Sequence, residues 1–297
     1  MNVPSRITME SARRAQIDRW ILLTGQIFGK TVLHLVVAAG AFFFMLPFAW
    51  MVSTSLKQGA LVMRMPPVWI PPKFIWDNYV HPWTMENFSL FYRNTAIICT
   101  CCVVGTMCSS TLVAYAFARL RFPGRGIVFL TVLASLMLPG QVTLIPTYVL
   151  FSRLHWVDTW FPLIVPTSLG SSFHIFLLRQ YFMTISRELD DAAKIDGCSL
   201  LGIFFRIILP LSRPVLGVVG IFELMYWWNE FFTPLIYLNR PERMTISIGL
   251  RFFQDRDQGH LEWTMAMTVV SVIPMIIVFF VAQRRFIQGI VISGIKG

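Results

Sequence analysis

The chain has 297 residues, of which 56% are apolar and only 13% are charged. Soluble globular domains carry about 25% charged residues, and a soluble fold of this size could not bury so much apolar surface. The formal net charge is +10, and the mean hydropathy is +0.64. The composition excludes a disordered chain. It predicts a polytopic membrane protein and argues against a soluble enzyme.

Six long stretches with few or no charged residues predict six membrane-spanning helices, because one span needs about 20 mainly apolar residues. They cover residues 31–56, 94–118, 126–152, 159–178, 214–239 and 263–283. A barrel is excluded, since its strands alternate polar and apolar residues over about ten positions. About 30 residues precede the first stretch, which exceeds the apolar core of a signal peptide, so we expect it to remain as an anchor.

The distribution of basic residues predicts the orientation. In the six-helix arrangement, sixteen Lys and Arg fall on the side that holds both termini and nine on the other side. Since basic residues concentrate in cytoplasmic loops, we expect both termini in the cytoplasm. Residues 1–30 are then an N-terminal tail, 31–284 the six-helix domain and 285–297 a C-terminal tail. The positive charge is explained by orientation in a membrane, and nucleic acid is not expected as a partner.

Two long loops lie on the outer side in this arrangement. Residues 53–93 are rich in Pro and Trp, and the prolines predict that no regular helix forms there. Residues 239–262 form a second loop with charges of both signs.

The inner loop at residues 186–214 predicts two short helices separated by a sharp bend. Ser186 and Ser199 can cap the two helices at their starts. Gly197 suits the left-handed residue that ends the first helix, and Pro210 should end the second. An ordinary amphipathic hairpin at the membrane surface would account for the first helix taken alone.

The order of residues in this loop is more specific than its amphipathicity. Asp-Ala-Ala, three further residues, Gly and a later Leu-Pro occupy residues 191–210. This order closely resembles the EAA loop of ABC-importer permeases, with Asp191 where the family usually has Glu. Further similarity covers residues 47–57, 114–124, 138–139, 145–146, 176–180, 228–231 and 286–297. Together these segments resemble the smaller membrane subunit of maltose-type sugar importers.

The resemblance implies an all-α, type I importer permease fold with a cytoplasmic coupling helix that docks into an ATPase. The residues that it assigns to this coupling are Glu188, Asp191, Ala192, Ala193, Asp196, Gly197 and Pro210. The implied partners are a second, related permease, two ATPase subunits, an extracytoplasmic solute-binding protein and membrane lipid. The implied location is the cytoplasmic (inner) membrane of a bacterium or archaeon. By the same resemblance, the loop at 239–262 reaches into the binding protein and the C-terminal tail contacts the ATPases.

The resemblance also implies a solute class. A sugar or an oligosaccharide is expected, and another solute such as glycerol phosphate remains the alternative. This chain would hold no cofactor, because ATP and Mg²⁺ would bind to the partner ATPase.

Two acids in the fifth predicted span suggest where the solute path lies. Glu223 and Glu230 are seven residues apart, so they share one face of a helix, and an acid at a helix centre costs roughly 2.5–3.5 kcal/mol on insertion scales. One interpretation is that they line the path together with Trp227 and Asn229. The other is that they pair with a neighbouring helix.

The sequence offers no catalytic or metal site. Residues 25–31 have three residues between their glycines, whereas a phosphate loop needs four and a preceding strand. The five histidines lack metal-ligand spacing, and no nucleophile elbow is present. An intramembrane enzyme is therefore disfavoured. An ion-coupled secondary transporter stays as an alternative, since such proteins carry ionisable residues near the middle of the membrane.

Overall fold

A computed structural model describes residues 6–85, 87–256 and 260–294, with side chains for 26–84, 87–251 and 260–283. Within these ranges the regular structure is entirely helical, which confirms the all-α class. The elements are α1 (Arg6–Ser55), α2 (Gly59–Val62), η1 (Trp76–Tyr79), α3 (His81–Met85), α4 (Phe88–Arg119), α5 (Arg125–Ser135), α6 (Gly140–Arg153), α7 (Phe161–Ser168), α8 (Ser172–Thr184), α9 (Glu188–Ile195), α10 (Leu200–Ile203), η2 (Phe204–Ile208), α11 (Leu209–Leu211), α12 (Arg213–Asn229), α13 (Phe232–Tyr237), η3 (Pro241–Arg243), α14 (Ile246–Arg256) and α15 (Leu261–Gly294).

Four segments in the described ranges are long and apolar enough to cross a membrane: part of α1, α4, α7 with α8, and α15. Two more are bent pairs, α5 with α6 at 97° and Leu200–Leu211 with α12 at 78°. With each bent pair counted as one span, the total agrees with the six predicted. The prediction of one continuous helix at 126–152 is wrong, because the span is broken between α5 and α6. Pro139 precedes α6 in an extended conformation, and a residue before proline avoids the helical region.

The fifth predicted span, 214–239, is also interrupted. α12 ends at Asn229, and a separate short helix, α13, follows. Pro234 has no N–H to donate to the carbonyl of Glu230, four residues earlier. That carbonyl instead accepts the Ser247 hydroxyl at 2.7 Å, and the Glu230 carboxylate accepts the N–H of Thr233 at 2.8 Å. The proline and the cap together explain the break.

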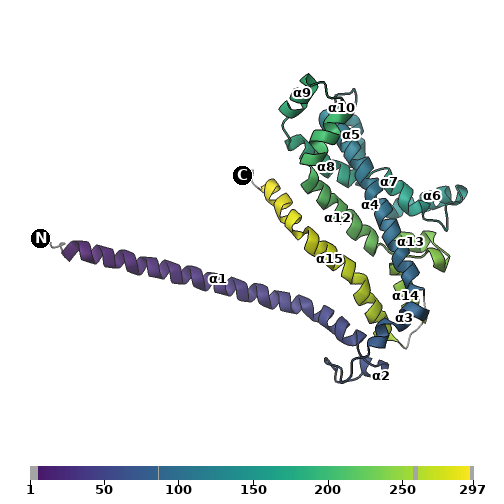
Figure 1. The fold of residues 1–297 in the computed structure, drawn as a ribbon, viewed down its shortest axis with the longest axis horizontal. Helices are drawn as coiled ribbons and strands as arrows, with labels where there is room; N and C mark the ends of the chain where they lie inside the picture. Colours follow the sequence, from purple (N-terminus) through teal and green to yellow (C-terminus); the bar gives the residue numbers. More distant parts are fainter. Residues whose placement is uncertain (1–5, 86, 257–259, 295–297) are drawn as a thin grey trace.

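α4 lies at the centre of the packed helices and contacts α7, α8 and α12 (Figure 1). Close approach between α4 and α7 depends on Gly105, because a Cβ there would overlap the side chain of Ser168. Buried residues form two clusters along α4, one around Phe88 and Ile98 and the other around Tyr115. The central helix therefore links the two ends of the core.

α1 leaves this body at a wide angle and packs against α15 (Figure 1). Beyond its end, the prediction that no regular helix forms at 53–93 is partly wrong, because α2, η1, α3 and the first six residues of α4 lie within this segment. Lys57 is fully buried over the ring of Trp50, with its ammonium donating to Thr54 at 3.2 Å. Burial lowers the pKa of Lys57. Asn78 donates to the carbonyls of Ser55 and Lys57 and fixes this turn.

The predicted loop at 239–262 also contains a helix, α14, which packs against α4 and α15. Asn94 on α4 donates to the carbonyl of Met244 at 3.0 Å, and Thr95 accepts the N–H of Ile246 at 2.8 Å. These bonds explain why a polar sequence folds back onto the helices instead of remaining an open loop.

Asp158, between α6 and α7, anchors the start of this segment. Its carboxylate accepts the N–H groups of Asn239 and Arg240 and pairs with the guanidiniums of Arg240 and Arg243. Burial alone would raise the pKa of Asp158, but these hydrogen bonds and charges outweigh it and hold the pKa below its usual value.

We expect Asp158→Ala to increase hydrogen exchange of the amides at 239–243, because two backbone donors lose their acceptor. Asp158→Asn should exchange more slowly than the alanine variant, since its amide oxygen still accepts and Asn tolerates the positive φ of 58° at this position. In the unaltered protein the stabilisation should be present above about pH 4. It should disappear as the pH falls through the lowered pKa. Unchanged exchange in Asp158→Ala would contradict this role.

Candidate functional site

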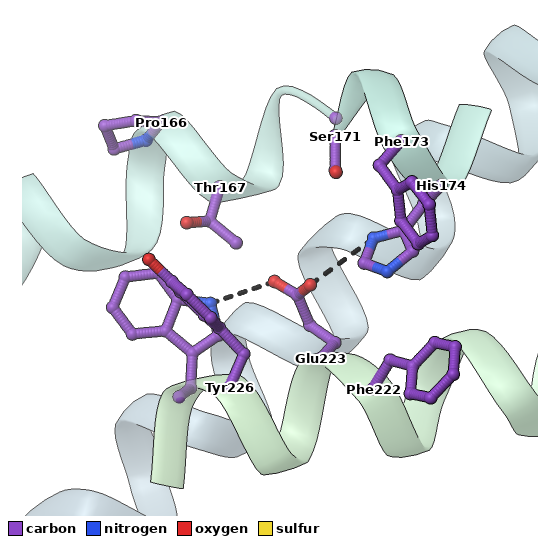
Figure 2. A pocket seen from close by; sticks show the side chains of 10 residues that line it. Pro166, Thr167, Ser171, Phe173, His174, Phe222, Glu223 and Tyr226 are labelled. Atoms are coloured by element: carbon purple, nitrogen blue, oxygen red, sulfur yellow. Dashed lines mark hydrogen bonds and ion pairs between the residues drawn. The ribbon is translucent and has the colours of Figure 1, made fainter. Parts of the chain in front are cut away.

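A cavity of about 540 Å³ lies between the α7–α8 pair and α12 (Figure 2). This volume is within the usual range for small-molecule sites, about 300–1,000 Å³. Its walls come from two elements that are distant in sequence and adjacent in the fold. The lining residues are Pro166, Thr167, Gly170, Ser171, Phe173, His174, Phe222, Glu223, Tyr226 and Trp227.

Glu223 is the polar centre of this cavity wall and is only 6% exposed. One carboxylate oxygen accepts the hydroxyl of Thr106 on α4 and the indole N–H of Trp227, both at 2.9 Å. The other oxygen lies 3.4 Å from Nδ1 of His174 on α8 (Figure 2). Nδ1 of His174 makes no hydrogen bond among the described residues, so this is a close contact between α8 and α12. One carboxylate therefore connects three helices, which favours the helix-pairing interpretation for Glu223.

The remaining wall offers aromatic surfaces and hydroxyl groups. Phe173, Phe222 and Tyr226 are between 41% and 56% exposed, and Figure 2 shows them around the cavity with Thr167 and Ser171. Aromatic rings provide apolar faces, while hydroxyls donate and accept hydrogen bonds. Among the described lining residues there is no Lys or Arg, and Glu223 is the one carboxylate.

Of the four residues predicted for the solute path, two line the cavity. Glu223 and Trp227 line the cavity. Asn229 donates to the carbonyl of Met225 at the end of α12, and Glu230 caps α13 beyond it. Glu223 lies within α12, whereas Glu230 is the residue that caps its end.

Sequence reasoning did not single out His174 for this site. An ionisable side chain inside an otherwise uncharged span marks a candidate functional position, so the sequence could have indicated His174. Its approach to Glu223 depends on the packing of α8 against α12, which no local pattern reveals.

The loop at 185–212 has the predicted two-helix form. Gly197 has φ of +78°, which confirms the left-handed residue at the bend, and Ser199 accepts the N–H of Gly202 at 3.1 Å as the cap of α10. Ser186 accepts the N–H of Glu188 at 3.2 Å ahead of α9. The prediction that Pro210 ends the second helix is wrong, because α11 (Leu209–Leu211) continues through it. A π turn, η2, precedes it and accommodates the missing N–H, and the chain bends at Ser212.

α9 has an inner and an outer face. Asp190 and Ala193 are buried against the protein, whereas Glu188, Asp191, Ala192, Asp196 and the bend at Gly197 are exposed. Asp191 pairs with Lys194 at 3.0 Å, with side chains 69% and 53% exposed. A pair this exposed contributes little stability, about 0–1 kcal/mol. Asp191 is therefore available to a partner, together with the exposed apolar side chains of Leu189 and Ile195.

Comparison with known proteins identifies the kind of molecule to which this architecture belongs. The sequence profile of the binding-protein-dependent transport system inner membrane components matches residues 110–292. The chain belongs to this family. Members of this family are membrane subunits of binding-protein-dependent transport systems. Membership of the family therefore disfavours an ion-coupled secondary transporter. Among the described residues, no group of three His, Cys, Asp or Glu side chains could hold a metal ion.

Three relatives of this permease extend the match over most of the chain. The probable ABC transporter permease protein YurM of Bacillus subtilis is 34% identical over 84% of this chain and 83% of its own length. The arabinooligosaccharides transport system permease protein AraQ of B. subtilis is 32% identical over 88% and 96%. The sn-glycerol-3-phosphate transport system permease protein UgpE of Yersinia pestis is 30% identical over 88% and 95%.

Two solved structures share the permease fold. A chain of a bacterial ABC transporter involved in the import of the acidic polysaccharide alginate has a TM-score of 0.75, at 23% identity, over 96% of this chain and 99% of its own. A chain of a bacterial alginate ABC transporter in complex with an alginate pentasaccharide-bound periplasmic protein has a TM-score of 0.58, at 17% identity, over 91% and 96%. These likenesses show the fold.

We expect Glu223→Ala to lower the thermal stability of the purified permease. The buried indole N–H of Trp227 would lose its acceptor, whereas the Thr106 hydroxyl keeps the carbonyl of Thr167, and an unsatisfied buried donor costs about 1–3 kcal/mol. Glu223→Gln should have a smaller effect, since its amide oxygen still accepts. Exposed Glu242 provides the control, and Glu242→Ala should leave the midpoint of unfolding in detergent unchanged. Equal midpoints for Glu223→Ala and the control would contradict the bridging role.

Proposed function

We propose that this chain is a membrane-spanning permease subunit of an ATP-driven importer, and that it forms part of the path for a carbohydrate. The observation that carries the proposal is the two-faced α9. Its inner face is packed on the protein, and its outer face presents acids, the small side chain of Ala192 and apolar side chains to a partner. Such a face suits a helix that seats in the cleft of another protein, with Asp191 pairing with a basic group there.

The partner at α9 is an ATP-binding subunit, one of two in the assembled transporter. ATP and Mg²⁺ bind to those subunits, and this chain supplies the path and the coupling. A second, related permease completes the membrane domain, and an extracytoplasmic binding protein delivers the solute. Support for a binding protein comes from the family description and from the alginate transporter whose structure includes a periplasmic protein.

The protein lies in the cytoplasmic (inner) membrane of a bacterium or archaeon, with both termini and α9 in the cytoplasm. The excess of Lys and Arg on that side supports this orientation. Transport follows alternating access. Closure of the ATPase subunits moves the docked α9 with the bend at Gly197, and the membrane helices then reorient to open the cavity to the other side.

The lining of the cavity between the α7–α8 pair and α12 favours a sugar as the solute and disfavours an anionic solute. Its aromatic faces and hydroxyls match the apolar faces and hydroxyl groups of a sugar. A phosphate would need a cationic partner, and among the described lining residues there is no Lys or Arg. Glycerol phosphate, named for the relative UgpE, is therefore the weaker alternative.

The docking proposal predicts that Asp191→Arg abolishes both solute uptake and the stimulation of ATP hydrolysis by the loaded binding protein, because it reverses the charge presented to the ATPase. The assay uses the transporter assembled with its partners in proteoliposomes. Asp77→Arg makes the same change at an exposed position in η1 and should have no effect. Coupled uptake that survives Asp191→Arg would overturn the docking proposal.

The path proposal predicts that Tyr226→Ala raises the KM for uptake, because the variant loses an exposed aromatic wall of the cavity. A single aromatic contact corresponds to roughly a threefold to tenfold change, about 0.5–1.5 kcal/mol. Met225→Ala alters the adjacent residue, which does not line the cavity. The same KM in both variants would indicate that the solute passes elsewhere.

A further inference from the structure

A buried ion pair connects the end of α4 to α9. Arg119 is the last residue of α4, and its Nη1 lies 3.3 Å from Oδ2 of Asp190, with side chains 3% and 10% exposed. Its Nη2 donates to the carbonyl of Ile185 at 2.8 Å. Ile185 is the C-cap of α8 and begins the connection to α9. One guanidinium therefore holds both α9 and the segment that leads into it.

A second contact, one turn earlier on α4, holds the other side of the bend. The hydroxyl of Tyr115 donates to the carbonyl of Leu200, the first residue of α10, at 3.0 Å. Its ring lies 5.0 Å from the ring of Phe204. Residues 115 and 119 share one face of a helix because they are four apart. α4 therefore contacts the loop both before and after the bend at Gly197, and we call these two contacts the α4 clamp.

The same helix reaches the cavity whose wall contains Glu223. Thr106, which donates to Glu223, precedes Arg119 by thirteen residues, or about 20 Å at 1.5 Å per residue. Figure 1 shows α4 running between the α9–α10 end of the molecule and the region of α7 and α12. A straight, closely packed helix moves as a unit, because packed interiors deform little. A displacement at Arg119 therefore reaches the wall of the cavity.

We propose that Arg119 is a positioning residue for energy coupling. Through Asp190 and Ile185 it fixes α9 on α4, so that movement of α9 by a docked ATPase becomes movement of α4 and of the cavity wall. This inference rests on the proposed function. It assigns different roles to two adjacent acids: Asp190 pairs inward with Arg119, and Asp191 remains outward for the ATPase.

Among the described residues, Arg119 is the one salt-bridge partner of Asp190, while Arg121, Arg187 and Lys194 line the cavity beside this pair without pairing with Asp190. Oδ1 of Asp190 and Nε of Arg119 are buried without any hydrogen-bond partner. Removing either side chain would leave the other charge buried and uncompensated, which is strongly destabilising to the local arrangement. Exchanging the two charges would preserve the attraction.

The test uses the assembled transporter in proteoliposomes and measures solute taken up per ATP hydrolysed. We expect Arg119→Gln and Asp190→Asn each to lower this ratio by about tenfold or more, because a buried charge loses its partner. The double variant Arg119→Asp with Asp190→Arg should recover a substantial part of the ratio. Arg121→Gln is the matched control, since exposed Arg121 lies beside the same pair, and it should leave the ratio unchanged.

A variant that fails to assemble would not report on coupling, so Tyr115→Phe provides a milder test. It removes one hydroxyl and its bond to Leu200 but keeps the ring, and we expect the ratio to fall by about twofold to tenfold. A purely structural role would lower the amount of assembled transporter and leave uptake per ATP unchanged. That result for Arg119→Gln and Tyr115→Phe would overturn the proposal, as would an exchanged pair that performs no better than the single variants.

The result for Asp191 separates this inference from the docking proposal. If Asp191→Arg abolishes uptake while Arg119→Gln leaves the ratio intact, the α4 clamp alone is wrong. If neither variant has an effect, docking at α9 is wrong as well.

Discussion

The packing of α4 is the constraint on which the rest of the structure depends. α7, α8 and α12 contact this helix, and Gly105 permits close approach to α7 because no side chain intervenes. Polar groups on α4 then find partners at three depths: Asn94 and Thr95 near one end, Thr106 at the cavity, and Arg119 at the other end. A buried polar group without a partner is costly, and each of these pairings therefore restricts where the neighbouring helices can lie.

The carboxylate of Glu223 shows how one group can be structural and still border a cavity. Its two oxygens face Thr106, Trp227 and His174, so it has little capacity left for a solute. An ionised group deep in a membrane protein would be unfavourable without such partners. Phe222 and Tyr226 lie on the same helix, and their side chains are 41% and 56% exposed. The cavity wall thus combines one buried carboxylate that joins helices with partly exposed aromatic surface.

The loop at 185–212 shows a similar separation among its acids. The acidic first turn of α9 favours helix formation there, since negative charge stabilises the start of a helix. Beyond that shared effect, Asp190 is buried on Arg119, whereas Asp191 is exposed beside Lys194. Residues adjacent in sequence project about 100° apart around a helix, so one faces the protein and the next faces solvent.

The sequence by itself determined the membrane class, the number of spans and the bend at Gly197, because these depend on composition, on the length of apolar runs and on the local conformational preferences of Gly and Ser. The sequence predicted the breaks within the third and fifth spans less well. Pro139 and Pro234 were visible in the sequence, but the partners that make each break stable, such as Ser247 at the Glu230 carbonyl, come from other segments. Only the tertiary structure decided that Glu223 meets His174 and that Asp190 meets Arg119. Those contacts join residues 49 and 71 positions apart, and the packing of whole helices, which no local pattern specifies, brings them together.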